Sequence, residues 1–311
     1  MSSAPPRTVG VIGLGNMGGR IARRIRDGGY PVVGYDSDPT SFERWALTPT
    51  ASVSELVHHC GVVLMSLPDS RVIDDVVYRD DGLLASIRDG QIVVDLSTAD
   101  PSSSVKIHGD LRSQGAEFID AGISGGAAAA DQGALVVMAG GSASALAAIT
   151  DILETFASRV HQMGEPGSGH TTKLLNNFLN AISLAASAEA MIAGRKAGLD
   201  LAKLLDVLNH SSGVNFATLQ RLPRIIEGDY LEGGLTSELM AKDLRSYLEL
   251  LRQLGVTSFT GTACLGVFDL AIALGYGKQI SNRVVDAIGD VAGGVRLQGF
   301  ERDAGAAGGK K

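Results

Sequence analysis

The sequence predicts an N-terminal α/β domain built on a largely parallel sheet, followed by an all-α C-terminal domain that opens with one long helix. Three observations predict this fold. Short β-branched runs alternate with amphipathic helical segments in the first half, the second half is almost entirely helical, and 311 residues suit two domains rather than one core. We place the domains at residues 1–165 and 166–295, and we expect residues 296–311, rich in Gly and Ala, to be a disordered tail.

Six short runs rich in β-branched residues mark the strands of the first domain. They are Thr8–Gly13, Val32–Tyr35, Val62–Ser66, Ile92–Leu96, Glu117–Ala121 and Leu135–Ala139. Amphipathic segments lie between them, among them Met17–Asp27, Ser70–Tyr78 and Ser102–Gln114. Because strands and helices alternate at this rhythm, we expect a largely parallel sheet with helices on both faces, whose edge strands could run antiparallel.

The pattern changes at the glycine-rich breaker formed by residues 164–169. After it, apolar residues recur every four positions from Leu174 to Ala186, which predicts a helix from about His170 to Ala197. Further helices are predicted at Leu201–Asn209, Leu219–Ile226, Ser237–Leu254, Thr262–Leu274 and near Ile280–Asp290. Few β-branched runs interrupt them, so the second domain should be all-α.

Composition excludes several classes of protein. A net charge of -7 argues against a nucleic-acid-binding protein, which usually carries a basic stripe. Cys60 and Cys264 form neither a metal-binding pattern nor a disulfide framework, so we expect reduced thiols and no metal. The first residues lack an apolar signal segment, and the apolar stretches fall short of the roughly 20 residues that a membrane-spanning helix needs. We therefore expect a soluble, cytoplasmic protein that binds neither nucleic acid nor membrane.

A glycine-rich turn follows the first predicted strand. Its sequence is Gly13-Leu14-Gly15-Asn16-Met17-Gly18, a GxGxxG pattern between a strand and a helix. Gly13 permits the tight turn, Gly15 lets a pyrophosphate approach the backbone, and Gly18 lets helix and strand pack closely. The free N–H groups of the helix N-terminus favour phosphate binding. The context predicts a Rossmann-type domain in which these six residues bind a dinucleotide; a purely structural turn is the alternative.

An acidic residue at the end of the second strand indicates which dinucleotide binds. Asp36 can accept hydrogen bonds from both ribose hydroxyls and would repel a 2′-phosphate, and no Arg follows immediately, so NAD is favoured over NADP. Two later strand ends, Met65–Pro68 and Asp95–Thr98, should complete the cofactor site because ligands bind at the carboxyl ends of parallel strands. A solvated Asp36 and ordinary turns are the alternatives.

A serine and two glycines follow a later strand, in the segment Asp120 to Gly126. Adjacent glycines expose backbone N–H groups, and Ser124 adds a hydroxyl, so Ser124, Gly125 and Gly126 could hold a carboxylate. A mobile loop is the alternative, which the following alanines Ala127–Ala130 favour.

The long helix opens with a lysine and two amides. Lys173 and Asn177 share a helix face, with Asn176 beside them. Oxidation of an alcohol by NAD needs a group that accepts the hydroxyl proton, and a lysine with a depressed pKa can do so. The alternative is a solvated lysine. The later motif Lys242-Asp243-Leu244 alone indicates no more than a surface ion pair.

Together these motifs resemble the β-hydroxyacid dehydrogenase family, whose members include 3-hydroxyisobutyrate dehydrogenases and tartronate semialdehyde reductases. The resemblance runs in order over about residues 8–290, through the glycine turn, the segment Asp120 to Gly126, the segment Gly167 to Asn177 and Lys242-Asp243-Leu244. It implies a small carboxylate-bearing 3-hydroxy acid as substrate and a homodimer or homotetramer built through the helical domain.

The resemblance also implies roles for single residues. Lys173 would be the acid/base residue. Ser124, Gly125 and Gly126 would bind the substrate carboxylate, and Asn177 would help to place the substrate. The cofactor would contact Leu67, Pro68, Thr98 and Lys242.

Several positions depart from the family pattern. Gly122 replaces the usual proline, Phe216 stands where many members have Trp, and Leu235 where many have Phe. Ile123 replaces valine, and Ala127–Ala130 lacks a common glycine. Three alternatives stay open: a 6-phosphogluconate-type dehydrogenase, an imine reductase and a non-catalytic NAD-binding sensor. Asn176-Asn177 argues against the first, Lys173 against the second, and the joint presence of Ser124, Lys173 and Asn177 against the third.

Overall fold

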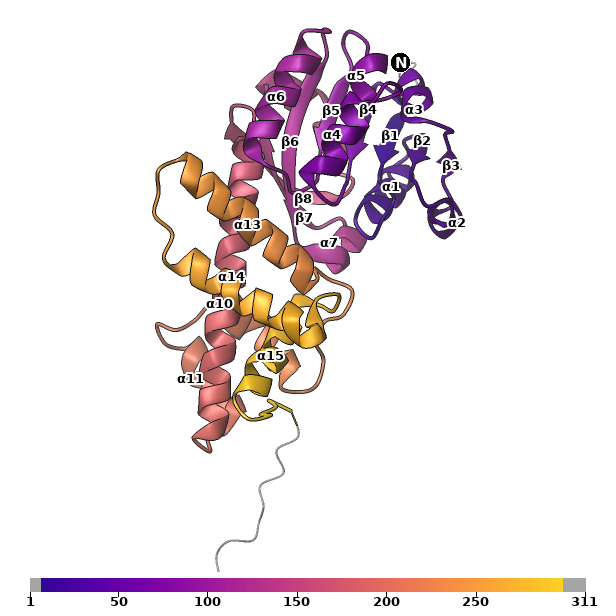
Figure 1. Cartoon of the computed structure of the whole chain (residues 1–311). Coiled ribbons are helices and arrows are strands. Elements are labelled where there is room, and N and C mark those ends of the chain that lie inside the picture. Colours follow the sequence, from indigo (N-terminus) through magenta and orange to yellow (C-terminus); the bar gives the residue numbers. More distant parts are fainter. Residues whose placement is uncertain (1–6, 299–311) are drawn as a thin grey trace, which may run out of the picture. The chain divides into compact units, whose positions relative to one another are not determined.

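The computed structural model describes residues 7–298 and divides the chain into two compact units, Met1–Asn176 and Asn177–Lys311. The division falls inside the longest helix, α10 (Ser168–Lys196), so the first turns of this helix belong to the first unit. The predicted fold class is confirmed: an α/β unit with a mainly parallel sheet precedes a helical region that α10 opens (Figure 1).

The first unit is built on one eight-stranded sheet with the order β3-β2-β1-β4-β5-β6-β7-β8. Its strands are β1 (Val9–Ile12), β2 (Val32–Tyr35), β3 (Thr48–Pro49), β4 (Val62–Met65), β5 (Ile92–Asp95), β6 (Glu117–Ser124), β7 (Leu135–Gly140) and β8 (Ala157–Gly164). The strands β1 to β6 are parallel, β7 is antiparallel to β6, and β8 is parallel to β7.

The sequence prediction missed two strands and shortened a third. β3 has only two residues, one of them a proline, and β8 has mostly exposed side chains, so neither shows an apolar alternation. β6 was expected to end at Ala121 but runs on to Ser124, because β7 pairs with residues 120–124 as well.

Helices cover both faces of this sheet, because alternate side chains of each central strand face opposite sides. Val62 and Leu64 belong to one buried core, and Val63 and Met65 belong to the other. The helices of this unit are α1 (Gly18–Asp27), α2 (Thr40–Trp45), α3 (Val53–His59), α4 (Ser70–Tyr78), α5 (Leu83–Ser86), α6 (Pro101–Arg112), α7 (Gly126–Gln132), α8 (Ala143–Ala148) and α9 (Thr150–Leu153). Helix α1 packs in the first core, and α3, α4, α5 and α6 pack in the second.

The second unit is helical, as predicted, but several predicted helices are divided. After α10 come α11 (Leu201–Asn209), the π-helix η1 (Ala217–Arg221), α12 (Leu222–Ile225), α13 (Ser237–Gln253), α14 (Thr260–Ala271), the π-helix η2 (Ile272–Tyr276), the 3₁₀-helix η3 (Ser281–Arg283) and α15 (Val284–Val291). The divided helices are those predicted at 219–226, 262–274 and 280–290. Their apolar periodicity does not reveal a local change of helical pitch.

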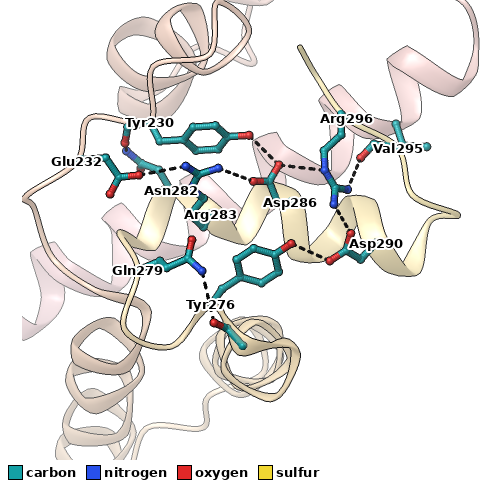
Figure 2. Close-up of polar contacts among 11 residues, drawn as sticks. Tyr230, Glu232, Tyr276, Gln279, Asn282, Arg283, Asp286, Asp290, Val295 and Arg296 are labelled. Carbon is teal, nitrogen blue, oxygen red and sulfur yellow. Dashed lines mark hydrogen bonds and ion pairs between the residues drawn. The ribbon is translucent and has the colours of Figure 1, made fainter. Parts of the chain in front are cut away.

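A charged cluster fixes the last helix of this unit (Figure 2). The Tyr230 hydroxyl donates to Asp286 over 2.7 Å, and Arg283 donates to the other oxygen of Asp286 over 3.0 Å. Arg296 donates to Asp290 over 2.5 Å. Each of these two arginines therefore has at least one carboxylate partner.

The residues expected to begin the disordered tail are held in place. Leu297 is buried, and the Arg195 guanidinium donates to the carbonyl oxygens of Arg296, Leu297 and Gln298. The rest of the expected tail, residues 299–311, lies outside the described residues.

Candidate active site

The glycine-rich turn lies between β1 and α1, as predicted. A Cβ atom on Gly13, where φ is +88°, would overlap the carbonyl oxygen of Ser66, and a Cβ on Gly18 would overlap that of Gly13. Both glycines are therefore required by close packing. Gly15 is exposed, and a Cβ there would meet nothing within 4 Å. The free space at Gly15 is what a bound pyrophosphate needs, so the turn fits a dinucleotide.

Asp36 lies directly after β2 and is tied to this turn. One carboxylate oxygen accepts from the Leu14 N–H over 2.5 Å, and the other accepts from the Asp38 N–H over 2.8 Å. The Trp45 indole donates to the Leu14 carbonyl over 2.8 Å, which fixes the turn from the other side. Asp36 is half-buried, so its charge stays close to the turn.

Two further strand ends lie at the same edge of the sheet. The strands β1, β2, β4 and β5 are parallel neighbours, so the residues after each of them share that edge. The Leu67 N–H donates to the Ser97 hydroxyl over 2.9 Å, and the Ser97 N–H donates to Asp95 over 3.0 Å. The structure therefore brings Leu67, Pro68 and Thr98 to the edge that carries the glycine turn and Asp36.

Lys173 lies against β6. A Cβ on Gly122 would be 2.5 Å from the Lys173 Cβ and 2.9 Å from its Cγ. A Cβ on Gly169 would overlap the Asp120 carbonyl oxygen and lie 2.5 Å from that of Met138. These two glycines let the first turns of α10 approach the sheet closely. The departure from proline at Gly122 thus falls where the strand contacts the lysine.

The serine and glycines expected to bind a carboxylate follow at the end of the same strand. Ser124 is two residues after Gly122, so its side chain is on the strand face that Lys173 contacts. Gly125 and Gly126 are exposed and have φ values of +129° and +72°. Ala127–Ala130, expected to favour a mobile loop, are part of α7 instead.

Asp120 caps the N-terminus of α10, a role that the sequence analysis did not predict. Its two carboxylate oxygens accept from the Gly167 N–H over 2.7 Å and from the His170 N–H over 2.8 Å. Acceptors of this kind satisfy N–H groups that the helix itself cannot pair. Burial raises the pKa of Asp120, although His170 and these hydrogen bonds act in the opposite direction.

His170 is fully buried beside this turn and was also missed. Its Nδ1 is 2.8 Å from the Ser104 hydroxyl, and its Nε2 is 3.3 Å from the Asp95 carbonyl oxygen. These contacts join α10 to α6 and to the end of β5. His170 is 66 positions from Ser104 and 75 from Asp95 in the sequence, so no local signal links it to them.

In the second unit, Asn177 is held by the Lys-Asp-Leu motif of α13. The Asn177 amide donates to Asp243 over 2.6 Å, and the Lys242 Nζ is 3.0 Å from the other Asp243 oxygen. Asp243 is only 3% exposed, so this is not the surface ion pair that the motif alone suggested. Asp243 was not among the predicted site residues, although it stands within a predicted motif.

Residues 7–298 lack two features that would point to a protein of another kind. No group of three or more His, Cys, Asp or Glu side chains there could hold a metal ion. No helix in this part of the chain combines the length and apolar character that crossing a membrane requires.

Comparison with known proteins gives the family. Residues 8–164 match the model described as the NAD binding domain of 6-phosphogluconate dehydrogenase, and residues 167–288 match that described as NAD-binding of NADP-dependent 3-hydroxyisobutyrate dehydrogenase. Mitochondrial 3-hydroxyisobutyrate dehydrogenase of Mus musculus is 33% identical in an alignment 287 residues long, and the match covers 89% of this chain and 86% of that protein. The chain belongs to the β-hydroxyacid dehydrogenase family.

Other members of the family agree with this assignment. L-threonate dehydrogenase of Cupriavidus necator is 32% identical and covers 90% of this chain and 95% of its own length. A solved structure of Mycobacterium tuberculosis 3-hydroxyisobutyrate dehydrogenase with L-serine has a TM-score of 0.82, is 27% identical, and covers 90% of this chain and 98% of that one. The protein is an NAD-dependent hydroxyacid dehydrogenase, and the phosphogluconate-type and sensor alternatives are not favoured.

Proposed function

We propose that this dehydrogenase oxidises the hydroxyl group of a small 3-hydroxy acid reversibly, with Lys173 as the general acid/base. The observation that carries the proposal is the contact of Lys173 with Gly122, on the strand that leads to Ser124, Gly125 and Gly126. The compounds in the names of the relatives, 3-hydroxyisobutyrate and L-threonate, both carry a hydroxyl β to a carboxylate, which fits the same class of substrate.

Each residue in the proposal has one task. The chemistry that bound NAD would supply is a nicotinamide acceptor for the hydride of the carbinol carbon. Lys173 accepts the hydroxyl proton in oxidation and donates it in reduction. The Ser124 hydroxyl and the N–H groups of Gly125 and Gly126 bind the carboxylate, and Asn177 places the substrate. Asp120 and Asp243 act as positioning residues, because they fix the start of α10 and the Asn177 amide.

The cofactor is proposed to bind along the carboxyl edge of the sheet. Residues Gly13, Leu14, Gly15, Asn16, Met17 and Gly18 would bind the pyrophosphate, and Leu67, Pro68 and Thr98 would line the site, with Lys242 over the cofactor. Asp36 would bind the ribose hydroxyls and disfavour a 2′-phosphate. The hydrogen bond from Leu14 to Asp36 supports this, because it fixes the carboxylate beside the turn.

We also propose a homodimer or homotetramer in the cytoplasm. Leu175 and Leu179 of α10 are 42% and 63% exposed, and exposed leucines one turn apart favour a helical interface. The oligomeric state is measurable by light scattering.

The test is NADH formation from NAD⁺ against a panel of 3-hydroxy acids, with NADP⁺ in parallel. Lys173→Ala should retain NADH binding, measured by fluorescence, and lose turnover by roughly 10²–10⁴-fold, the usual contribution of an acid/base group. Lys203→Ala, at an exposed lysine of α11, is the matched control and should keep full activity. Turnover that survives Lys173→Ala would show that another group transfers the proton.

A further inference from the structure

One arginine of the second unit is half-buried and forms no ion pair with an acidic residue among residues 7–298. Arg221 ends the π-helix η1, and its Nη2 donates to the Asn180 side-chain oxygen over 2.9 Å. Its Nη1 is buried and has no hydrogen-bond partner within residues 7–298, where Arg221 also forms no ion pair. Arg79 and Arg283 each have a buried nitrogen without a partner as well, but both are paired with carboxylates.

An unpaired Arg221 guanidinium is energetically unfavourable when no ligand is bound. A desolvated cation needs a counter-charge, and the Asn180 amide is neutral. A guanidinium has five N–H donors in a planar fork, and a single amide oxygen satisfies few of them. Burial lowers the pKa of Arg221 to about 10, so the group stays positively charged at neutral pH. The contrast is clear in the cluster of Figure 2, where Arg283 and Arg296 both contact carboxylates.

The turn that carries Arg221 is fixed by its own hydrogen bonds. The Asn215 side-chain oxygen accepts from the N–H groups of Ala217 and Thr218 over 2.9 and 3.2 Å, and its amide donates to Ser187 of α10 over 3.0 Å. The guanidinium also lies 5.5 Å from the centre of the Phe216 ring. π-Helical turns are rare and frequently occur at functional sites. The start of the turn that carries Arg221 is therefore anchored to α10, and the hydrogen bond to Asn180 directs the guanidinium toward the same helix.

The partner of Arg221 lies on the helix face that carries the proposed substrate residues. Asn180 is three residues after Asn177 and seven after Lys173 in the continuous helix α10. Residues with this spacing share one face of an α-helix. Arg221 thus adds a positive charge beside the face that bears Asn177.

We propose that Arg221 and Asn180 form a subsite for a second anionic group of the substrate, a carboxylate or a phosphate. The inference rests on the proposed function and narrows its substrate class to 3-hydroxy acids that carry a negative charge at the end distant from the first carboxylate. A planar guanidinium binds both kinds of oxyanion with two parallel hydrogen bonds, which fits the unpaired Nη1. The Asn180 side chain orients the fork.

The kinetic test compares three substrates of similar length: 3-hydroxyvalerate, 3-hydroxyglutarate and 3-hydroxy-4-phosphobutyrate. The wild type should have a higher kcat/KM for an anionic substrate than for 3-hydroxyvalerate. Comparing 3-hydroxyglutarate with 3-hydroxy-4-phosphobutyrate shows whether the subsite prefers a carboxylate or a phosphate. Arg221→Met should lower the ratio of anionic to neutral kcat/KM by roughly 10- to 100-fold, as expected for a lost hydrogen bond to a charged group. Arg221→Lys, which keeps the charge without the fork, should give an intermediate ratio.

The matched control is Arg224→Met. Arg224 is exposed and paired with Asp229, and it lies three residues from Arg221, so this variant should keep the wild-type ratio. Circular dichroism establishes that the variants are folded. If Arg221→Met does not fold, the wild-type ratio of anionic to neutral kcat/KM alone tests the subsite. A preference for 3-hydroxyvalerate in the wild type, or an equal loss for all substrates in a folded Arg221→Met, would overturn the subsite.

A binding measurement separates this inference from the proposed function. The NADH-bound protein should bind glutarate at least tenfold more tightly than butyrate by calorimetry, and Arg221→Met should abolish the difference. Glutarate binding that depends on Arg221, in a protein that oxidises no hydroxy acid, would refute the proposed function and retain the subsite. Turnover with neither selective glutarate binding nor a kinetic preference for 3-hydroxy-4-phosphobutyrate would retain the function and refute the subsite.

Discussion

Replacing Gly122 by alanine tests how closely Lys173 must approach the sheet. The new Cβ would lie 2.5 Å from the Lys173 Cβ, whereas ordinary contact begins at 3.4 Å, so one backbone must move by about 1 Å. Overpacking of this kind costs about 1–3 kcal/mol. A misplacement of about 1 Å can lower the rate by as much as 10²-fold. We expect kcat to fall by roughly 10- to 100-fold and the melting temperature to fall by a few degrees.

The assay measures kcat with the best 3-hydroxy acid, NADH affinity by fluorescence, and thermal unfolding. NADH affinity should change by less than about twofold, because the clash is at β6 and not at the glycine turn. Gly109→Ala is the control: this exposed glycine of α6 has nothing within 4 Å of a new Cβ, so activity should be unchanged. An unchanged kcat in Gly122→Ala would show that this contact does not position the lysine.

Three more results are expected. Asp36→Ala should weaken NAD much more than NADP in Kd measurements, and an equal loss would remove the argument for cofactor choice. Asp243→Ala leaves Asn177 without its acceptor, so it should lower the free energy of unfolding by about 1–3 kcal/mol in urea titrations and lower kcat; full stability and activity would contradict the positioning role. Burial raises the pKa of Cys60 and of Cys264 to about 12 from 9.0, so at pH 8 iodoacetamide should label the native thiols about 10³-fold more slowly than the unfolded ones, and rapid native labelling would refute their burial.

The sequence predicted the parts of this protein whose signals are local. The glycine turn consists of consecutive residues. The helical repeat alone places Lys173 and Asn177 on one face of a helix. The alternation of strands and helices in the first unit also follows from short-range sequence patterns. These elements could be located without knowing which strands are neighbours.

The missed residues depend on contacts between distant segments. Asp120 reaches His170 across 50 positions, and Asn177 reaches Asp243 across 66. Nothing near either acid in the sequence indicates its partner. The position of Arg221 depends on a π-helical turn, and an apolar repeat cannot distinguish such a turn from an α-helix.

Because Asp120 of β6 caps the N-terminus of α10, folding of this helix depends on the sheet. The first turn of this helix finds its acceptors on β6, which pairs with β5 and β7. A helix start of this kind cannot be complete in the isolated segment, because its N–H groups have no such acceptor until the sheet has assembled. Amide hydrogens of Gly167 and His170 should therefore become protected from exchange together with those of the central strands. The lysine would then acquire its place late and cooperatively, so a chain with an unfinished sheet would have no partly active form.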